Sequence, residues 1–409
     1  MNICYLVRSF SARAGTESYV CHMAIALAKQ GHRVHVVSLT GQERALFKDF
    51  NNKIVFHKID LKINVLFRLL RLERVFPLFV ILYGKAISRV LSALIESQAI
   101  DIIEATDWGM DAWAYLPQRR VPVCVRLHGY PGCKAEFDGN TLKAWPKNII
   151  IWMMQRNHIL SADLVTGVSK GYVDFARMAW EIKEKYIKII PISIDRSIFH
   201  PFEKIRKNNA VIFVGRLEEA KGIAVLGQAI SLILKIIPDT IFYFAGVDHE
   251  CGDGQQTWSR YLISEYGNKH IVYLGSIQTQ QLIQCYQTAT LCVVPSLYEP
   301  GGTVVFEAMA CGCPVLASRV GGLEEVIQDR HSGLLVPPGD ASALAEGMLE
   351  LLQDSQLRQE YAQNALETVR NKFDINAIST QTVEAYAEAI TTFNDHRKAS
   401  TRHNRRSHP

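Results

Sequence analysis

The segment from Pro295 to Gly322 carries residue types that could bind a phosphate and a sugar hydroxyl. It reads P-S-L-Y-E-P-G-G-T-V-V-F-E-A-M-A-C-G-C-P-V-L-A-S-R-V-G-G, with Glu299 before the Gly301-Gly302 turn and Glu307 after it. A glycine turn ahead of a helix presents backbone N–H groups at the positive end of the helix dipole, which suits a phosphate. Glu307, about one turn into that helix, could accept hydrogen bonds from a ribose diol. The alternative is an ordinary strand–helix unit with a surface glutamate at each end.

A second group of candidates lies earlier in the same half of the chain. Arg216 follows the apolar run Ala210 to Gly215, and Lys221 comes five residues later. Ligands of open parallel sheets bind at the carboxyl ends of the strands, where both cations would lie. Together they could neutralise a diphosphate. The alternative is a solvated arginine in a loop and a lysine at the start of a helix.

The first half offers two weaker candidates. Val121 to Leu127 predicts a strand, and His128-Gly129 follows it. A histidine at that edge could face a ligand, although a histidine with a purely structural role has the same pattern. Gly15 lies in the turn after the first apolar run, Asn2 to Val7.

The elements that must position these residues form two α/β halves. In the first half, strands are expected at 2–7, 33–39, 121–127 and 164–168, and a helix at 17–30 that ends at Gly31. In the second half, strands are expected at 210–215, 241–245, 271–274, 291–294 and 314–317, and they alternate with helical stretches. The alternation predicts parallel sheets, and the length favours two domains.

The expected fold class is therefore α/β, with two Rossmann-like, doubly wound domains that face one another across a cleft. The predicted boundaries are an N-terminal domain over 1–198 and a C-terminal domain over 199–373, joined by a polar linker between Ile194 and Asn209. A helix over 374–395 could return to the first domain. The basic tail over 396–409 is predicted to be disordered.

Composition excludes several other classes. Of the 409 residues 48% are hydrophobic and 21% are charged, the balance of a soluble globular chain rather than a disordered one. The longest uncharged apolar run, Val75 to Gly84, is too short to cross a bilayer. The N-terminus lacks the layout of a signal peptide. The nine cysteines form no C-x-x-C pair, which predicts reduced thiols in the cytoplasm and no metal site.

Charge is distributed unevenly along the chain. Residues 1–200 hold 27 Lys and Arg against 17 Asp and Glu, whereas residues 201–395 hold 13 against 23. The first half is therefore expected to meet an anionic partner. Within it, Lys62 to Arg89 has six cations and one acid among apolar residues, which predicts peripheral binding to anionic membrane. An ordinary helix pair with a solvated basic face is the alternative. Nucleic acid is not an expected partner, because the basic tail has no interleaved aromatic residues.

These motifs together resemble the retaining nucleotide-sugar glycosyltransferases of glycosyltransferase family four, whose fold is called GT-B. The resemblance extends to about Phe393. It rests on Gly15 with Glu17, His128-Gly129, the stretch from Pro191 to Asp195, Gly215-Arg216 with Lys221-Gly222, and above all the span from Glu299 to Glu307. The two glutamates separated by seven residues and followed by A-M-A-C-G-x-P-V are the most specific part.

The resemblance implies donor-binding roles in the second half. Arg216 and Lys221 would hold the diphosphate of a nucleoside-diphosphate sugar. The turn at Gly301 would lead into Gly302 and Thr303, whose backbone N–H groups would bind the distal phosphate. In the family an aromatic residue usually stands where this chain has Gly301.

The remaining roles concern the sugars. The resemblance implies that Glu307 binds the ribose hydroxyls and Glu299 the transferred sugar. His128 would lie against that sugar from the other domain and stabilise positive charge near the anomeric carbon. Gly15 would let the first loop approach the phosphate or the acceptor.

The implied reaction is metal-independent transfer of the sugar, with retention, to a hydroxyl of a glycan, a lipid or a lipid-linked acceptor. The nucleotide sugar is a co-substrate, and no cofactor is expected. Two other function classes stay open. One is a GT-B-like nucleotide-sugar epimerase, for which the acid and base residues are not identifiable. The other is a degenerate sugar-nucleotide-binding subunit of a transferase complex.

Overall fold

A computed structural model describes most of the chain, and its contacts divide the chain into two compact units. The described residues are 1–10, 15–41, 45–50, 52–59, 76–129, 146–182, 185–202, 208–252, 254 and 256–406. Unit 1 comprises residues 1–168, 172–191 and 375–409, and unit 2 comprises residues 169–171 and 192–374. Each unit is described by itself.

Unit 1 is built on a seven-stranded sheet in the order β3-β2-β1-β4-β5-β6-β7. Its described strands all pair in parallel. The strands are β1 (Asn2–Phe10), β2 (Arg33–Gly41), β3 (Ile54–Lys58), β4 (Ile102–Thr106), β5 (Val123–Leu127), β6 (Leu164–Gly167) and β7 (Lys188–Ile189). Its helices are α1 (Gly15–Lys29), η1 (Ala45–Phe50), α3 (Phe76–Gln98), η3 (Leu116–Gln118), α5 (Pro146–Leu160), α6 (Lys170–Ala179) and α14 (Ile375–Arg406).

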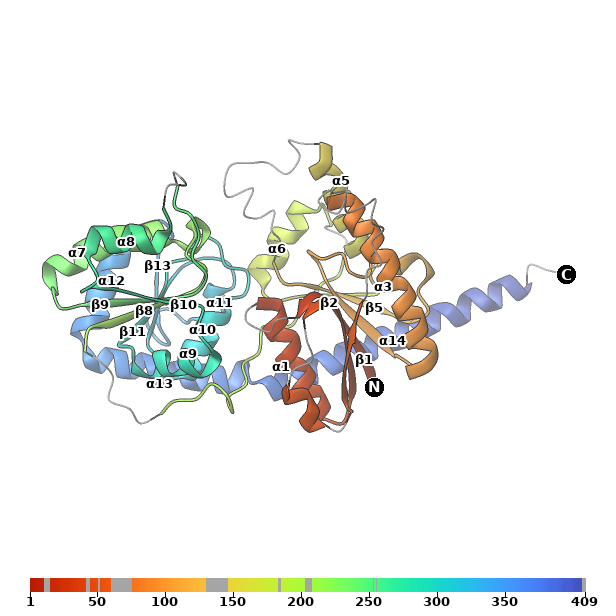
Figure 1. Cartoon of the computed structure of the whole chain (residues 1–409). Coiled ribbons are helices and arrows are strands. Elements are labelled where there is room, and N and C mark those ends of the chain that lie inside the picture. Colours follow the sequence, from red (N-terminus) through yellow and green to blue (C-terminus); the bar gives the residue numbers. More distant parts are fainter. Residues whose placement is uncertain are drawn as a thin grey trace. The chain divides into compact units, whose positions relative to one another are not determined.

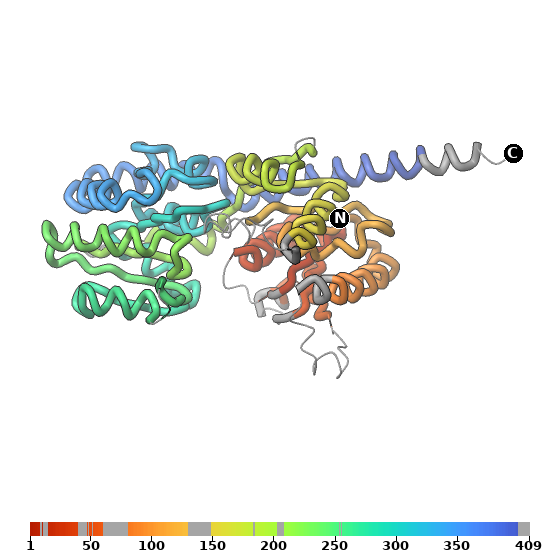
Figure 2. The backbone as a smooth tube through the Cα atoms, turned by 90° about the horizontal axis from the view of Figure 1, so that it is seen from above, coloured from red at the N-terminus to blue at the C-terminus, as the bar shows by residue number. Residues whose placement is uncertain are grey.

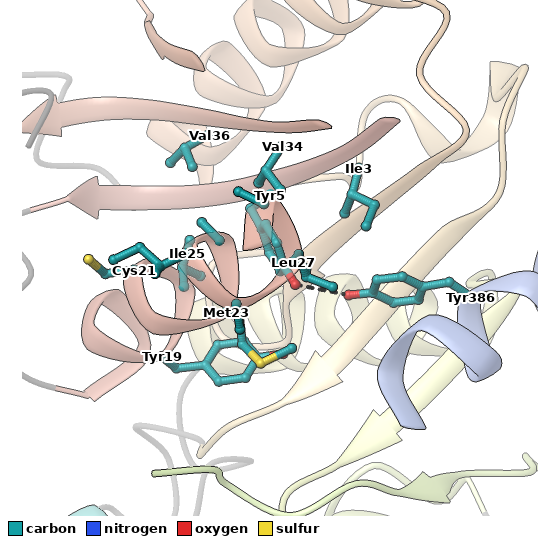
Figure 3. Close-up of a cluster of buried hydrophobic side chains, with 14 of the residues drawn as sticks. Ile3, Tyr5, Tyr19, Cys21, Met23, Ile25, Leu27, Val34, Val36 and Tyr386 are labelled. Atoms are coloured by element: carbon teal, nitrogen blue, oxygen red, sulfur yellow. Dashed lines mark hydrogen bonds between the residues drawn. The ribbon is translucent and has the colours of Figure 1, made fainter. Parts of the chain in front are cut away.

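Helix α14 contributes to the core of unit 1 although it comes last in the chain. It packs beside α1, and Ile378, Ala385 and Tyr386 join the buried cluster of β1, α1 and β2. Tyr5 and Tyr386 point toward one another (Figure 3), and their hydroxyl oxygens are 3.4 Å apart. The Tyr386 hydroxyl also lies 2.5 Å from Glu104 Oε2. The buried Glu104 carboxyl is thus tied to α14, although burial raises its pKa.

Helix α14 extends into the tail over 396–409, and the disorder expected for that tail stays a prediction. Helix α14 begins at Ile375 and ends at Arg406, and its blue part is one continuous helix in Figure 2. Its sequence contains neither glycine nor proline over this range, so each residue adds to a helix that is already nucleated on unit 1. Residues 407–409 lie outside the described part of the chain.

Unit 2 is built on a six-stranded sheet in the order β10-β9-β8-β11-β12-β13. Its strands are β8 (Ala210–Val214), β9 (Ile241–Ala245), β10 (Ile271–Gly275), β11 (Leu291–Val294), β12 (Val315–Ser318) and β13 (Leu334–Val336). Its helices are η5 (Glu219–Lys221), α7 (Ile223–Ile236), α8 (Trp258–Tyr266), α9 (Thr279–Thr288), α10 (Thr303–Ala310), α11 (Leu323–Val326), α12 (Ala341–Gln353) and α13 (Ser355–Lys372).

Helices cover both faces of this second sheet. Figure 1 shows α7 and α8 on one side and α9 and α13 on the other. The central strands are therefore buried on both faces, which explains why they read as continuous apolar runs such as A-V-I-F-V in β8. Two Rossmann-like α/β units are present, as the sequence predicts.

The boundary between the units falls between Pro191 and Ile192, earlier than the predicted boundary at residue 198. Ile194 and Phe199 are buried in the core of unit 2, beside α10 and α13. The Ile194 N–H also donates to the Phe373 carbonyl, 3.0 Å away. This stretch therefore belongs to unit 2 because its apolar side chains complete that core.

The segment predicted to lie on a membrane, Lys62 to Arg89, is only partly covered by the structure. Residues 62–75 lie outside the described part of the chain, and Phe76 to Arg89 forms the first part of α3. No helix in the described ranges has the length and apolar character needed to span a bilayer. Peripheral binding stays a prediction.

Candidate functional site

The predicted binding residues of unit 2 lie where the strand order of its sheet reverses. β8 and β11 are neighbours at the centre of the sheet, and the chain continues outward from them in opposite directions. Such a switch point leaves a crevice at the carboxyl ends of the two strands. Arg216 and Lys221 follow β8, whereas Glu299, the glycine turn and Glu307 follow β11. The sheet topology therefore brings the two groups of candidates to one edge.

The two loops at this edge are joined through their backbones. The Leu297 N–H donates to the Ala220 carbonyl at 3.0 Å. Gly222 has a left-handed φ of 71°, and a Cβ on it would lie 1.8 Å from the Pro295 carbonyl oxygen. Only glycine permits this approach, because any side chain would collide with backbone.

We expect Gly222→Ala to destabilise unit 2 and separate these loops. The left-handed backbone alone costs an alanine roughly 1–2 kcal/mol. The collision with Pro295 should add about 1–3 kcal/mol. Gly339→Ala is the matched control, because Gly339 lies in a turn with a φ of 78° and an added Cβ would only touch Leu297 Cδ2 at 3.8 Å. Urea unfolding of both variants measures the difference, and equal destabilisation would show that the loop contact contributes nothing.

An ion pair joins the two loops at their tips. Lys221 Nζ lies 2.6 Å from Glu299 Oε2, and the two side chains are 22% and 14% exposed. The other carboxylate oxygen of Glu299 accepts the Gly302 N–H at 3.2 Å. Lys221, which is predicted to bind the diphosphate, is therefore paired with Glu299, which is predicted to bind the sugar. The Gly302 N–H, predicted to bind phosphate, donates to the same carboxylate.

The glycine turn is supported by a third loop that the sequence analysis did not assign. Gly321 and Gly322 follow β12, and the Gly322 N–H donates to the Glu299 carbonyl at 3.0 Å. A Cβ on Gly321 would lie 2.3 Å from that same carbonyl oxygen. Both glycines could have been recognised from the sequence, since they lie four and five residues after the strand predicted at 314–317.

The start of α10 has the predicted form. Gly301 is buried, and Gly302 precedes the helix with a φ of 71° and a ψ of 41°. Gly302 has no side chain to cap the helix, which begins at the half-buried Thr303. A phosphate at this turn would therefore take over the Gly302 N–H from the Glu299 carboxylate.

Glu307 lies on α10 and has a partner that the sequence did not predict. The Tyr286 hydroxyl of α9 donates to Glu307 Oε2 at 2.9 Å. Burial raises the pKa of the Glu307 carboxyl to about 7, and this hydrogen bond opposes the shift. A carboxyl whose pKa burial shifts this far marks a candidate functional site.

Arg216 is the most exposed of the candidates. Its side chain is 56% exposed, and its guanidinium lies 2.8 Å from Oε1 of the buried Glu218. The preceding Gly215 lies against Gly246 at the end of β9, where an added Cβ on Gly246 would be 1.9 Å from the Gly215 carbonyl oxygen. The loop that carries Arg216 is thus fixed at its base and exposed at its tip.

Gly15 and His128 belong to unit 1. Gly15 opens α1 with a φ of 61°, and the residues directly before it lie outside the described part of the chain. The His128 ring packs edge-on against Tyr19, with ring centroids 4.8 Å apart. Burial and the nearby Arg126 guanidinium hold the pKa of His128 well below its usual value. The ring is therefore neutral, so it can exchange hydrogen bonds but carries no positive charge.

Comparison with known proteins gives two adjoining family matches. Residues 13–197 match Glycosyltransferase Family 4, and residues 195–368 match Glycosyl transferases group 1. The junction of the two matches lies close to the unit boundary at Pro191.

Relatives of known name and structure agree with these matches. A D-inositol 3-phosphate glycosyltransferase of Corynebacterium efficiens is 34% identical over 183 residues, which are 44% of this chain and 43% of that protein. The chain spans about half the length of the curated relatives that it matches at over 30% identity.

Two solved structures cover almost the whole chain. A sucrose-phosphate synthase from Thermosynechococcus elongatus has a TM-score of 0.77 at 24% identity and covers 96% of this chain and 100% of its own. Anabaena HepE in complex with UDP and glucose has a TM-score of 0.71 at 20% identity and covers 95% and 99%. These likenesses confirm the predicted GT-B fold.

Proposed function

Because residues 13–197 belong to Glycosyltransferase Family 4 and residues 195–368 to Glycosyl transferases group 1, we propose that this protein is a retaining, metal-independent glycosyltransferase. Its donor is a nucleoside-diphosphate sugar, and its acceptor is a hydroxyl of a glycan, a lipid or a lipid-linked molecule. The observation that carries the proposal is the Lys221–Glu299 ion pair, which lies at the switch point between β8 and β11 beside the glycine turn of α10.

The charges at this edge suit a diphosphate. Lys221 and the exposed Arg216 supply two cations. A diphosphate would take them over from the carboxylates that they now contact, Glu299 and Glu218. The first turn of α10 would supply backbone N–H groups. Glu307 accepts hydrogen bonds from the ribose hydroxyls, and its charged carboxylate form predominates above pH 7. The solved Anabaena protein of the same fold is a complex with UDP and glucose, which supports a nucleotide-linked donor.

The proposed reaction needs stabilisation of a leaving group more than it needs a strong base. The bond between the anomeric carbon and the diphosphate oxygen breaks, and Lys221 and Arg216 neutralise the charge that develops on that oxygen. The acceptor hydroxyl attacks on the same face, and its proton passes to the departing phosphate oxygen. Glu299 orients the sugar by accepting hydrogen bonds from its hydroxyls. The neutral His128 ring contributes by exchanging hydrogen bonds rather than by its charge.

The direct test is a panel of UDP-, GDP- and ADP-sugars, with melting temperature and slow donor hydrolysis as readouts. A ligand at a hundred times its Kd stabilises the folded state by about 2.7 kcal/mol, so one nucleotide class should raise the melting temperature. Product anomers read by NMR then test retention, and excess EDTA should leave the rate unchanged.

A matched pair of arginine variants makes this test specific. Arg216→Met should abolish most of the nucleotide-dependent shift. Arg330→Met should leave it intact, because Arg330 is also exposed and also pairs with a glutamate of unit 2, Glu350 at 3.0 Å, but lies away from the switch point. No shift with any nucleotide class, or equal losses in both variants, would refute the assigned donor site.

A further inference from the structure

Asp107 is a fully buried carboxylate that none of the roles described above uses. It directly follows β4, and none of its surface is exposed. Oδ1 accepts the backbone N–H of His128 at 3.2 Å, and Oδ2 accepts the hydroxyl of Tyr172 from α6 at 2.9 Å. One side chain thus connects the ends of two neighbouring strands with a helix.

The contacts of Asp107 concentrate on the backbone around His128. The nearby backbone N–H groups of Trp108 and Gly129 also favour its charged form. Its own N–H donates to the Arg126 carbonyl at 3.1 Å. Gly129 has a φ of 146°, a conformation that is open to glycine alone. The turn after β5 therefore needs glycine at position 129, and its backbone N–H groups face the Asp107 carboxylate.

Burial of a charged carboxylate is unfavourable unless hydrogen bonds compensate for the lost water. Burial raises the pKa of Asp107 to about 6, and its hydrogen bonds to His128, Tyr172, Trp108 and Gly129 oppose that shift. An uncharged residue would avoid this penalty at a position that served packing alone. The Asp107 carboxylate is therefore explained by the hydrogen bonds that it accepts rather than by packing.

We propose that Asp107 is a positioning residue that fixes the backbone of His128 and Gly129 and thereby the direction of the His128 ring. The ring is neutral, so its effect on a bound sugar depends on where its N–H and its lone pair point. The part of the inference that concerns transfer rests on the proposed function. The part that concerns the backbone does not.

The same loop provides a matched control in Asp111. It is equally buried, and burial raises its pKa to about 6 as well. Its carboxylate accepts the hydroxyl of Thr106 at 2.9 Å and lies near Arg8 and Tyr83 rather than His128. Asp107→Asn and Asp111→Asn therefore remove similar buried charges from the same loop.

Two measurements on the full chain test the proposal. Amide hydrogen exchange of the peptide that ends in His128 and Gly129 should be at least about tenfold faster in Asp107→Asn, because a hydrogen bond to a charged acceptor is lost. In steady-state kinetics with the nucleotide sugar that stabilises the wild type, kcat should fall about 10- to 100-fold while the donor KM changes less than about threefold. Asp111→Asn should change neither quantity more than about threefold.

The outcomes separate this inference from the proposed function. Unchanged exchange in Asp107→Asn, or equal effects in both variants, would overturn the positioning role. A wild type that is inactive with the whole panel would overturn the proposed function, and the exchange result would still decide the role of Asp107. If Asp107→Asn does not fold, Tyr172→Phe removes a single hydroxyl from the same carboxylate. It should accelerate the same exchange by a smaller factor, and no acceleration would count against the proposal.

Discussion

Replacing Glu307 with alanine is expected to lower kcat/KM for the nucleotide sugar by about 10²- to 10⁴-fold. Hydrogen bonds to a charged group contribute roughly 1.5–3 kcal/mol each, and the proposed ribose diol makes two of them to this carboxylate. The loss should appear mainly as a higher donor KM, because the ribose is remote from the bond that breaks. Initial rates over a range of donor concentrations measure both parameters.

Glu307→Ala also removes the acceptor of the Tyr286 hydroxyl, so a control for folding is needed. Loss of that buried partner costs about 1–3 kcal/mol of stability. Glu307→Gln keeps an oxygen for Tyr286 and should fold more stably, yet it should lose most of the donor affinity. Glu346→Ala, an exposed glutamate of α12, should change neither property. Normal donor kinetics in both Glu307 variants would rule out the ribose role.

The pH dependence of donor binding follows from the same carboxyl. Its pKa is raised from 4.5 to about 7, so the charged form predominates only above pH 7. Affinity for a nucleotide sugar should therefore fall as the pH is lowered from 8 to 6, because protonation converts one acceptor oxygen into a donor. Calorimetric titrations across this range should show the decline in the wild type and a flat profile in Glu307→Gln.

The local elements of this fold can be predicted from the sequence because each has a local cause. β8 and β11 are apolar runs that end at glycine or proline, and α10 begins after the Gly301-Gly302 turn, as expected. Because these parallel strands are buried on both faces, their apolar residues are not interrupted by alternating polar ones, and such runs are easy to recognise in a sequence. The glycosyltransferase family was recognisable for the same reason, since its most specific motif occupies one continuous segment.

The side-chain partners in the site could not be predicted, because they join distant parts of the chain. Lys221 contacts Glu299 only because β8 and β11 are neighbours in the sheet. Neither segment by itself predicts that strand order. Tyr286 looks like an ordinary core residue of α9 until its hydroxyl is seen beside Glu307. The role of Asp107 could not be predicted for the same reason, since its partner His128 follows a different strand.

Lys221→Met is expected to impair both catalysis and folding, and the two effects can be separated. The ammonium group would neutralise the departing diphosphate, so its loss should lower kcat/KM by about 10²- to 10³-fold. It also leaves Glu299, which is only 14% exposed, without its cation. Breaking a fully buried pair costs about 3–5 kcal/mol, and the 22% exposure of Lys221 brings the expected loss nearer to about 1–3 kcal/mol.

The double variant Lys221→Met/Glu299→Gln distinguishes the two contributions. Removing both charges relieves the uncompensated carboxylate, so urea unfolding should show recovery of most of the lost stability. Activity should stay low, because neither the cation for the diphosphate nor the carboxylate for the sugar is present. Lys235→Met, at an exposed position in the last turn of α7, controls for the loss of a lysine from the same unit. If the double variant regained activity along with stability, the ion pair would be structural only, and the leaving group would have to be stabilised by other residues.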